Sequence, residues 1–73
     1  MLKKPIVRFS LNDSLLDSIK LNKNAIIKPI NHPSKQVSNR TLAVTSGVIN
    51  MTCSMEKGQV IQFETINTIY IGE

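Results

Sequence analysis

The sequence predicts an α+β fold that is mostly β: an N-terminal helix followed by a small, strongly bent antiparallel sheet or barrel. An amphipathic, capped stretch over residues 10–22 predicts the helix, and alternating apolar and polar residues from Thr41 onward predict the strands. The length of 73 residues fits one small domain over 1–73, which buries only about 60% of its unfolded surface. Because a single cysteine excludes an internal disulfide, we expect stabilisation by homo-oligomer formation.

The helix is predicted over residues 10–22. Ser10 is a favourable N-cap residue, and Asp13 three positions later gives an aspartate version of the capping box. An apolar stripe follows at helical spacing, made of Leu11, Leu15 and Ile19. Residues 1–9 are expected to be an N-terminal arm or a short strand, because Pro5 disfavours an earlier helix start.

Residues 25–72 are predicted to form the bent sheet. The alternation changes phase at Gly47, which indicates a bulge or sharp bend in a long strand. We expect a hairpin turn at Met55–Gly58 and a second kink at Thr65–Asn67. Two apolar faces are predicted, one holding Ile49, Met51, Cys53 and Met55, the other Ile61 and Phe63 with Ile69 and Ile71. Four or five short antiparallel strands of this kind tend to curl into a small barrel of the SH3, Sm or OB type.

No residue pattern in the chain points to catalysis, so we expect a non-enzymatic protein without cofactors. His32 and Cys53 are the only histidine and cysteine and lie far apart in the sequence, which argues against a metal site. With no base nearby in the sequence, Cys53 is expected to be a buried, inert thiol. No apolar run approaches the roughly 20 residues of a membrane span, and the start lacks the apolar core of a secretory signal, so a cytoplasmic location is expected.

The charge of the chain is unevenly distributed. The net charge is +4, but residues 1–40 hold eight Lys and Arg against two Asp, whereas residues 41–73 hold one Lys against three Glu. The basic half either attracts a polyanion such as RNA or is an ordinary solvated surface. Lys20 and Lys23 share one face of the predicted helix, where they either contact phosphates or complement the helix dipole. The aromatic residues in the strands are either stacking platforms or core residues.

The stretch SLNDSLLDSIKLNK, residues 10–23, resembles the N-terminal helix of the Hfq branch of Sm-like proteins. Ser10, Leu11, Asp13 and Leu16 match that helix outright, and Asn12, Asp17, Ile19, Lys20 and Lys23 match it in kind. The stretch GQVIQFETINTIYI, residues 58–71, is similar to the final strands of the family, with Gln59, Ile66 and Thr68 in register. The Asn-Gly and Leu-x-Gly-x-Ile signature of the first two strands is missing, and Gln62-Phe63-Glu64-Thr65 replaces the Tyr-Lys-His-Ala motif.

The resemblance implies a homo-oligomeric ring, typically a hexamer, that binds single-stranded RNA. The RNA-binding residues that it suggests are Asn12 and Asp13 at the pore-side pocket, Lys20 and Lys23 on the rim, Gln59 near the opposite face, and Phe63 in the altered motif. Loss of the basic pair of that motif implies weakened uridine binding, or a ring that serves protein partners. The alternative function is that of a small phage- or plasmid-type effector that binds and modulates a host protein.

Overall fold

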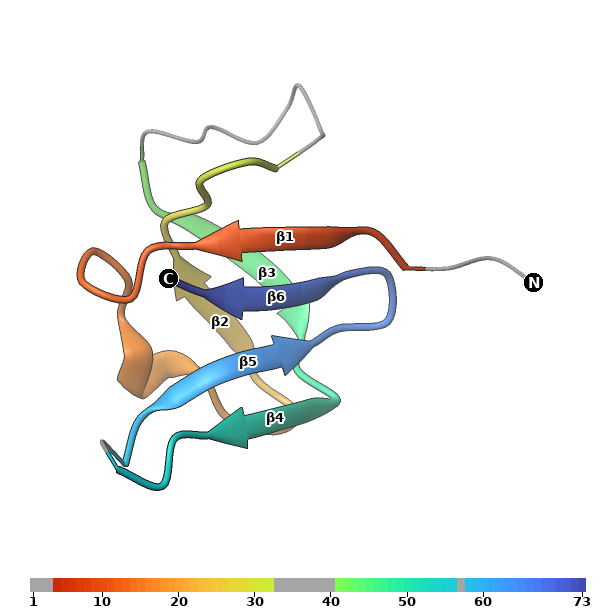
Figure 1. Cartoon of the computed structure of the whole chain (residues 1–73). Coiled ribbons are helices and arrows are strands. Elements are labelled where there is room, and N and C mark those ends of the chain that lie inside the picture. The colour runs from red at the N-terminus through yellow and green to blue at the C-terminus, as the bar shows by residue number, and fades with distance from the viewer. Residues whose placement is uncertain (1–3, 33–40, 57) are drawn as a thin grey trace.

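Six strands and one 3₁₀ turn form the fold over residues 4–32, 41–56 and 58–73, which are the residues that the computed structural model describes (Figure 1). The elements are β1 (Ile6–Phe9), η1 (Leu16–Ser18), β2 (Asn24–Ile27), β3 (Ala43–Gly47), β4 (Asn50–Cys53), β5 (Val60–Glu64) and β6 (Ile69–Gly72). The predicted N-terminal arm or strand and the predicted sheet both extend over residues outside this description, namely 1–3, 33–40 and 57.

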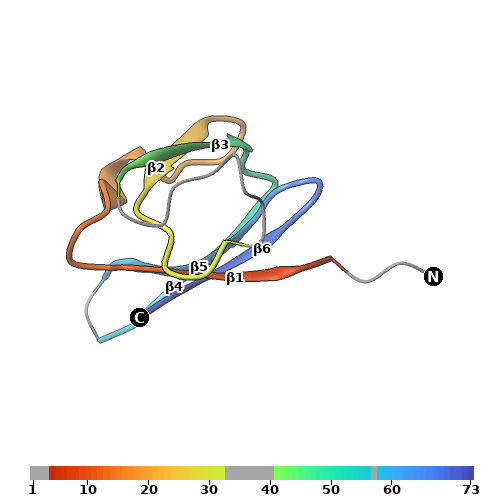
Figure 2. The same ribbon diagram turned by 90° about the horizontal axis from the view of Figure 1, so that it is seen from above.

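The strands form two sheets that lie one over the other (Figure 2). The larger sheet has the order β1-β6-β5-β4, and the smaller sheet pairs β2 with β3. The chain is therefore a small β protein, and the predicted closed barrel is wrong. The prediction of an antiparallel sheet is also wrong at one place, because β1 runs parallel to β6. Parallel pairing of these strands requires a long connection between them, and the rest of the chain supplies it.

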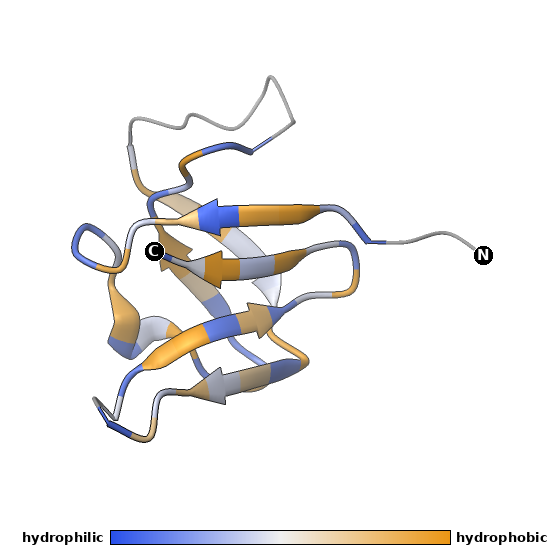
Figure 3. Cartoon of the chain, in the orientation of Figure 1, coloured by the Kyte–Doolittle hydropathy of each residue, from blue (hydrophilic) through white to orange (hydrophobic). Residues whose placement is uncertain are grey.

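The core lies between the two sheets and takes side chains from both. Alternation along β1 buries Val7 and Phe9 and exposes Ile6 and Arg8, as the two-residue period of a strand requires. Figure 3 shows hydrophobic stretches in β1 and β5, each interrupted by a hydrophilic one. The other buried apolar residues are Ile19, Ala25, Ile27, Val48, Val60, Phe63 and Tyr70.

The helix predicted over residues 10–22 is wrong. Ser10 and Asp13 do form one half of a capping box, since the Ser10 hydroxyl accepts the Asp13 N–H at 3.3 Å, and the same hydroxyl donates to Asp13 Oδ2 at 2.8 Å. That contact closes a turn over residues 11–13, and helical geometry is limited to Leu16–Ser18.

Hydrogen bonds to β2 explain why the helix does not form. The Leu15 N–H donates to the Ile26 carbonyl at 3.0 Å, and the Ser18 hydroxyl accepts the Ile26 N–H at 2.8 Å. The Ser14 hydroxyl accepts the Lys28 N–H, also at 2.8 Å. Serine, aspartate and asparagine side chains compete with the helical backbone for such bonds, and this segment is rich in all three. The segment therefore lies along β2 in an irregular conformation.

The strand pattern is interrupted at Gly47, but the interruption does not lie within one long strand. β3 ends at Gly47 in the smaller sheet, and β4 begins at Asn50 in the larger sheet. Between them Val48 is completely buried, and its N–H donates to the Lys23 carbonyl at 2.9 Å. The phase change in the sequence thus marks the point where the chain crosses from one layer to the other.

The predicted hairpin turn after β4 is present. The Gly58 N–H donates to the Ser54 carbonyl at 2.8 Å, and Gly58 has a φ of 65°, a conformation that glycine adopts without the strain of a side chain. Lys57 of this turn lies outside the described residues.

Both predicted apolar faces are wrong. Ile49 is half exposed, Cys53 is exposed, Met55 is fully exposed, and only Met51 is half-buried. Their strand, β4, is the last of its sheet and has a neighbour on one side only. In β6 the register pairs Phe63 with Tyr70, so Tyr70 is buried and Ile69 and Ile71 lie on the other face. A shift of one residue reverses every side chain of a strand, and the loop before β6 sets that shift.

Candidate functional site

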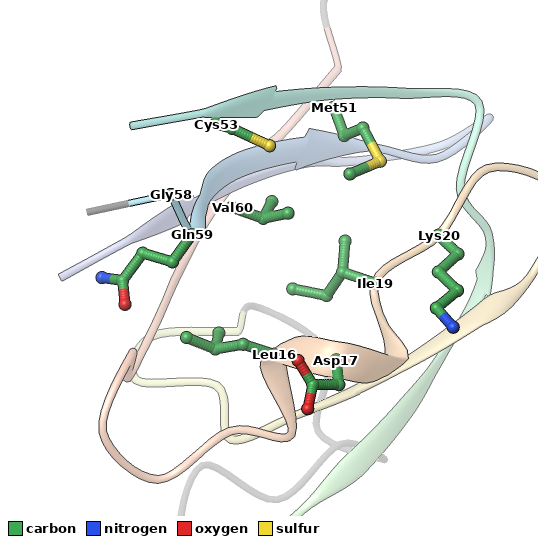
Figure 4. Close-up of a pocket in the computed structure, with 9 residues that line it drawn as sticks. All are labelled: Leu16, Asp17, Ile19, Lys20, Met51, Cys53, Gly58, Gln59 and Val60. Carbon is green, nitrogen blue, oxygen red and sulfur yellow. The ribbon is translucent and has the colours of Figure 1, made fainter. Parts of the chain in front are cut away.

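An open groove of about 660 Å³ between η1 and the β4–β5 hairpin is the candidate binding site (Figure 4). The groove is lined by Leu16, Asp17, Ile19 and Lys20 from the η1 segment and by Met51, Cys53, Gly58, Gln59 and Val60 from the hairpin. Figure 4 shows Met51 extending from β4 toward Ile19 on the opposite wall. Two segments far apart in the sequence thus face each other across it.

An irregularity in the hairpin shapes one wall of the groove. Thr52 is paired with Gln62, but Cys53 is paired with Val60, so Ile61 is the extra residue of a bulge on β5. The bulge keeps Val60 on the same buried side as Phe63, although the two are three positions apart. Val60 can therefore form the floor of the groove while Cys53 stands at its edge.

The groove combines an apolar floor with a polar rim. Ile19 and Val60 are buried, and Leu16 and Met51 are half-buried against the core. Asp17 and Lys20 belong to the rim and take part in no ion pair among the described residues. No group of three His, Cys, Asp or Glu that could hold a metal ion is found in the described part of the chain. The arrangement suits an apolar group with a polar end.

The resemblance suggested six RNA-binding residues, and the structure brings together only two of them. Lys20 and Gln59 both line the groove, whereas the resemblance placed them on different faces. Lys23 is exposed just before β2, and Asn12 is exposed in the turn over residues 11–13. Asp13 is exposed in the same turn, where it is paired with Lys28 at 3.7 Å.

Phe63 lies in the core, where only 1% of it is exposed. Its ring stacks on Tyr70 with centroids 4.7 Å apart, and it lies 5.4 Å from the ring of Phe9. A ring covered in this way presents no face to a base. Of the two alternatives for the aromatic residues in the strands, core packing is therefore the one that the fold adopts.

Sequence reasoning missed the apolar lining of the groove. It assigned Ile19 to a helical stripe, and it placed Met51 on a buried strand face. The η1 segment and the β4–β5 hairpin face each other across the groove although they are far apart in the sequence. No local sequence pattern therefore indicated that they come together.

Most of the described basic residues are neutralised within the fold. Lys4 is paired with Glu64, Arg8 with Glu73 at 3.0 Å, and Lys28 with Asp13. Five basic and five acidic side chains fall within the described residues; the other basic residues are Lys3, Lys35, Arg40 and Lys57. The described surface thus has no net charge, and Lys20 and Lys23 are its basic residues outside ion pairs.

No family model, curated protein or solved structure matches this chain. The stretch over residues 10–23 that resembles the N-terminal helix of Hfq-type proteins is not a helix in the structure, and the described strands form no closed barrel. Among these same residues, no helix has the length and apolar character needed to cross a membrane.

A second surface feature is a stretch without charge. Residues 41–55, TLAVTSGVINMTCSM, contain no Lys, Arg, Asp, Glu, His or Pro, and they supply both β3 and β4. Among the described residues, β3 pairs only with β2, and β4 only with β5. The stretch also supplies four exposed large apolar side chains, Leu42, Val44, Ile49 and Met55. Both strands with an open edge are thus uncharged and bordered by apolar groups.

Proposed function

We propose that this protein is a small, non-enzymatic binding protein whose partner is another protein. The observation that supports this is the uncharged stretch at residues 41–55, which forms both strands with an open edge. Open edges pair readily with other chains, and proteins that avoid such pairing usually place lysine, proline or a bulge on the edge. Neither lysine nor proline occurs in this stretch; the bulge beside β4 lies on its inner neighbour β5, whereas β3 has one extra residue between Val44 and Gly47 in its pairing with β2. Exposed apolar groups beside such edges favour contact with a protein over contact with a polyanion.

The outer face of the smaller sheet gives this proposal a location. Ile26 is paired with Val44 across the sheet and is bridged to Leu15 on its other side. Residues opposite each other in a sheet share a face, so these three apolar side chains form a row. Val44 is 67% exposed and Leu15 is 52% exposed. Complete burial of such a side chain is worth about 1.5–3 kcal/mol, so covering the exposed part of each contributes about 0.8–2 kcal/mol.

Photo-crosslinking tests the proposal. A photoreactive amino acid at Val44 should give a covalent adduct in cells of the source organism, and that adduct should be digested by protease but not by ribonuclease. The same amino acid at Asn12, which is exposed in the turn over residues 11–13, is the matched control and should give none. Leu15→Lys, which puts a charge into the row, should abolish the Val44 adduct. An RNA adduct at Val44, or equal adducts at both positions, would contradict the proposal.

RNA binding is a second candidate function, favoured by Lys20 and Lys23. Both are exposed, and neither takes part in an ion pair among the described residues. A homo-oligomer would repeat these two charges and strengthen their joint field. Binding of a labelled single-stranded RNA should then weaken with salt, with a slope of about 0.7 per neutralised phosphate, and Lys20→Glu with Lys23→Glu should reduce it for every sequence. Absence of binding at low salt would eliminate this candidate.

A further inference from the structure

We infer that β4 pairs with β4 of a second copy of the chain, so that the larger sheet continues across a two-fold axis. The inference rests on the proposed function, because it names one protein partner and the edge to which that partner binds. It uses the larger sheet, whereas the row at Val44 lies on the smaller one.

The two edges of the larger sheet differ in how they are covered. The outer edge of β1 is occupied by the chain after β2: the Ile30 N–H donates to the Arg8 carbonyl at 2.8 Å, and the Arg8 N–H donates to Asn31 Oδ1 at 2.7 Å. The other edge, β4, has no such neighbour among the described residues. One edge is therefore closed by the fold, and the other is left for a partner.

The residues of β4 favour a second β4 as that partner. Asn50–Cys53 contains no charged residue and no proline, so two copies approach without like-charge repulsion, and every backbone N–H that faces away from β5 is able to donate. Antiparallel pairing of a strand with its own copy gives a closed two-fold dimer. An arriving strand with charged residues would find no opposite charge on β4.

The faces of β4, together with the apolar residues beyond its ends, select the register of this pairing. Met51 and Cys53 both line the groove, and Met51 is paired with the buried Phe63. Thr52 lies on the opposite face, since it is paired with the exposed Gln62. Opposite residues of antiparallel strands lie on the same face, so Met51 must oppose an inward-facing residue of the partner. Centring the axis on Thr52 satisfies this condition, because it places Met51 opposite the partner's Cys53 and Thr52 opposite the partner's Thr52.

The same register accounts for the apolar groups that the single chain leaves exposed. Beyond the strand ends it brings Ile49, 50% exposed, toward the partner's Met55, a residue that is fully exposed in the single chain. The inward side chains of the partner's strand also extend the apolar lining of the groove past Met51. The surface is thus complementary to itself in backbone, charge and apolar side chains.

Charge placement at the axis tests the interface. Light scattering at micromolar concentration should give the mass of a dimer for the wild type. Thr52→Lys, which sets two lysines directly opposite each other on the exposed face, should weaken association about 100-fold or more. Ser46→Lys adds the same charge to the other open edge, on β3, and should leave the dimer intact. Circular dichroism on both variants checks that they are folded.

A cysteine at the axis tests the register. In a Cys53→Ser background, Thr52→Cys should form an intermolecular disulfide on mild oxidation, since opposed residues of antiparallel strands have Cα atoms about 4.5–5.5 Å apart. Ser46→Cys in the same background is the control and should stay monomeric in denaturing electrophoresis. A dimeric wild type without the Thr52 crosslink would overturn the register.

Other outcomes separate this inference from the proposed function. A wild-type monomer or ring, or a Thr52→Lys dimer, overturns the inference, and loss of association in Ser46→Lys alone would assign the interface to β3. If any of these occurs while the protein adduct at Val44 is still found, the proposed function stands without the β4 dimer. If the wild type is a dimer but no protein adduct forms at Val44, the second copy of the chain would instead be the one partner that the results support.

Discussion

Replacing Phe63 by leucine should cost the protein a large part of its stability, because Phe63 packs between two other aromatic rings. Its ring centroid lies 5.4 Å from that of Phe9 and 4.7 Å from that of Tyr70, and the second pair is nearly parallel at 11°. Each such pair contributes about 0.5–1.5 kcal/mol beyond its buried area, and the swap itself costs less than about 1.5 kcal/mol. The sum is about 1–4.5 kcal/mol, with a central value of about 2–3 kcal/mol, out of about 4–11 kcal/mol expected for a chain of this length.

Thermal unfolding at one fixed protein concentration measures this loss. The Tm of Phe63→Leu should fall by about 10–20 °C, since 1 kcal/mol shifts the Tm of so small a domain by about 4–8 °C. Gln62→Ala changes the exposed neighbour on the opposite face and should stay within about 0.5 kcal/mol of the wild type. In a double-mutant cycle, Phe63→Leu and Phe9→Leu together should cost less than the sum of the two. An unchanged Tm, or strictly additive costs, would refute the packing of the three rings.

Three further predictions follow from single contacts. Burial raises the pKa of the Tyr70 phenol above 10.0, by more than the hydrogen bond with Thr68 lowers it. The stability that depends on the neutral phenol is therefore complete below pH 10 and is lost as the pH rises toward the folded-state pKa; Tyr70→Phe should remove this loss in melts from pH 8 to 11. Cys53 is exposed, so it should react rapidly with a thiol reagent in dilute native protein or in Thr52→Lys, and more slowly at concentrations where β4 is paired. Ser18→Ala leaves the Ile26 N–H without its acceptor and should cost about 1–2 kcal/mol in urea unfolding, more than Ser10→Ala, whose hydroxyl only closes an exposed turn.

The parts of the fold that the sequence predicts correctly are those whose cause is local. Alternation after Thr41 gives strands, and Met55–Gly58 gives a turn because Gly58 adopts a positive φ. The helix prediction fails because its competitor is not local. Ser14 and Ser18 bond to Lys28 and Ile26, which lie 14 and 8 positions further along the chain. Capping signals and an apolar stripe cannot report those partners.

The candidate site was predictable only in part, for a related reason. Lys20 and Gln59 stood out as polar residues within a resemblance, and they do line the groove. The exposure of β4 was not predictable from the sequence. Alternation shows which side chains share a face, but it does not show whether another layer covers that face. Cys53 is exposed since its strand ends the sheet, and Met55 is exposed in the turn that follows that strand. The position of a strand within its sheet is a property of the whole chain.

The parallel pairing of β1 with β6 has a consequence for how the protein folds. Ile6 pairs with Ile69 and Phe9 with Gly72. The first described strand to be synthesised, β1, therefore has no pairing partner until the last one, β6, has been made. Joining segments so far apart requires closure of the loop from Ile6 to Ile69, and topologies dominated by such contacts fold in milliseconds to seconds rather than microseconds. Until β6 has left the ribosome, Phe63 has no Tyr70 to stack on and the three-ring core cannot assemble. The nascent chain therefore exposes its apolar residues throughout synthesis, and its final structure forms in a step that begins only after residue 72 is made.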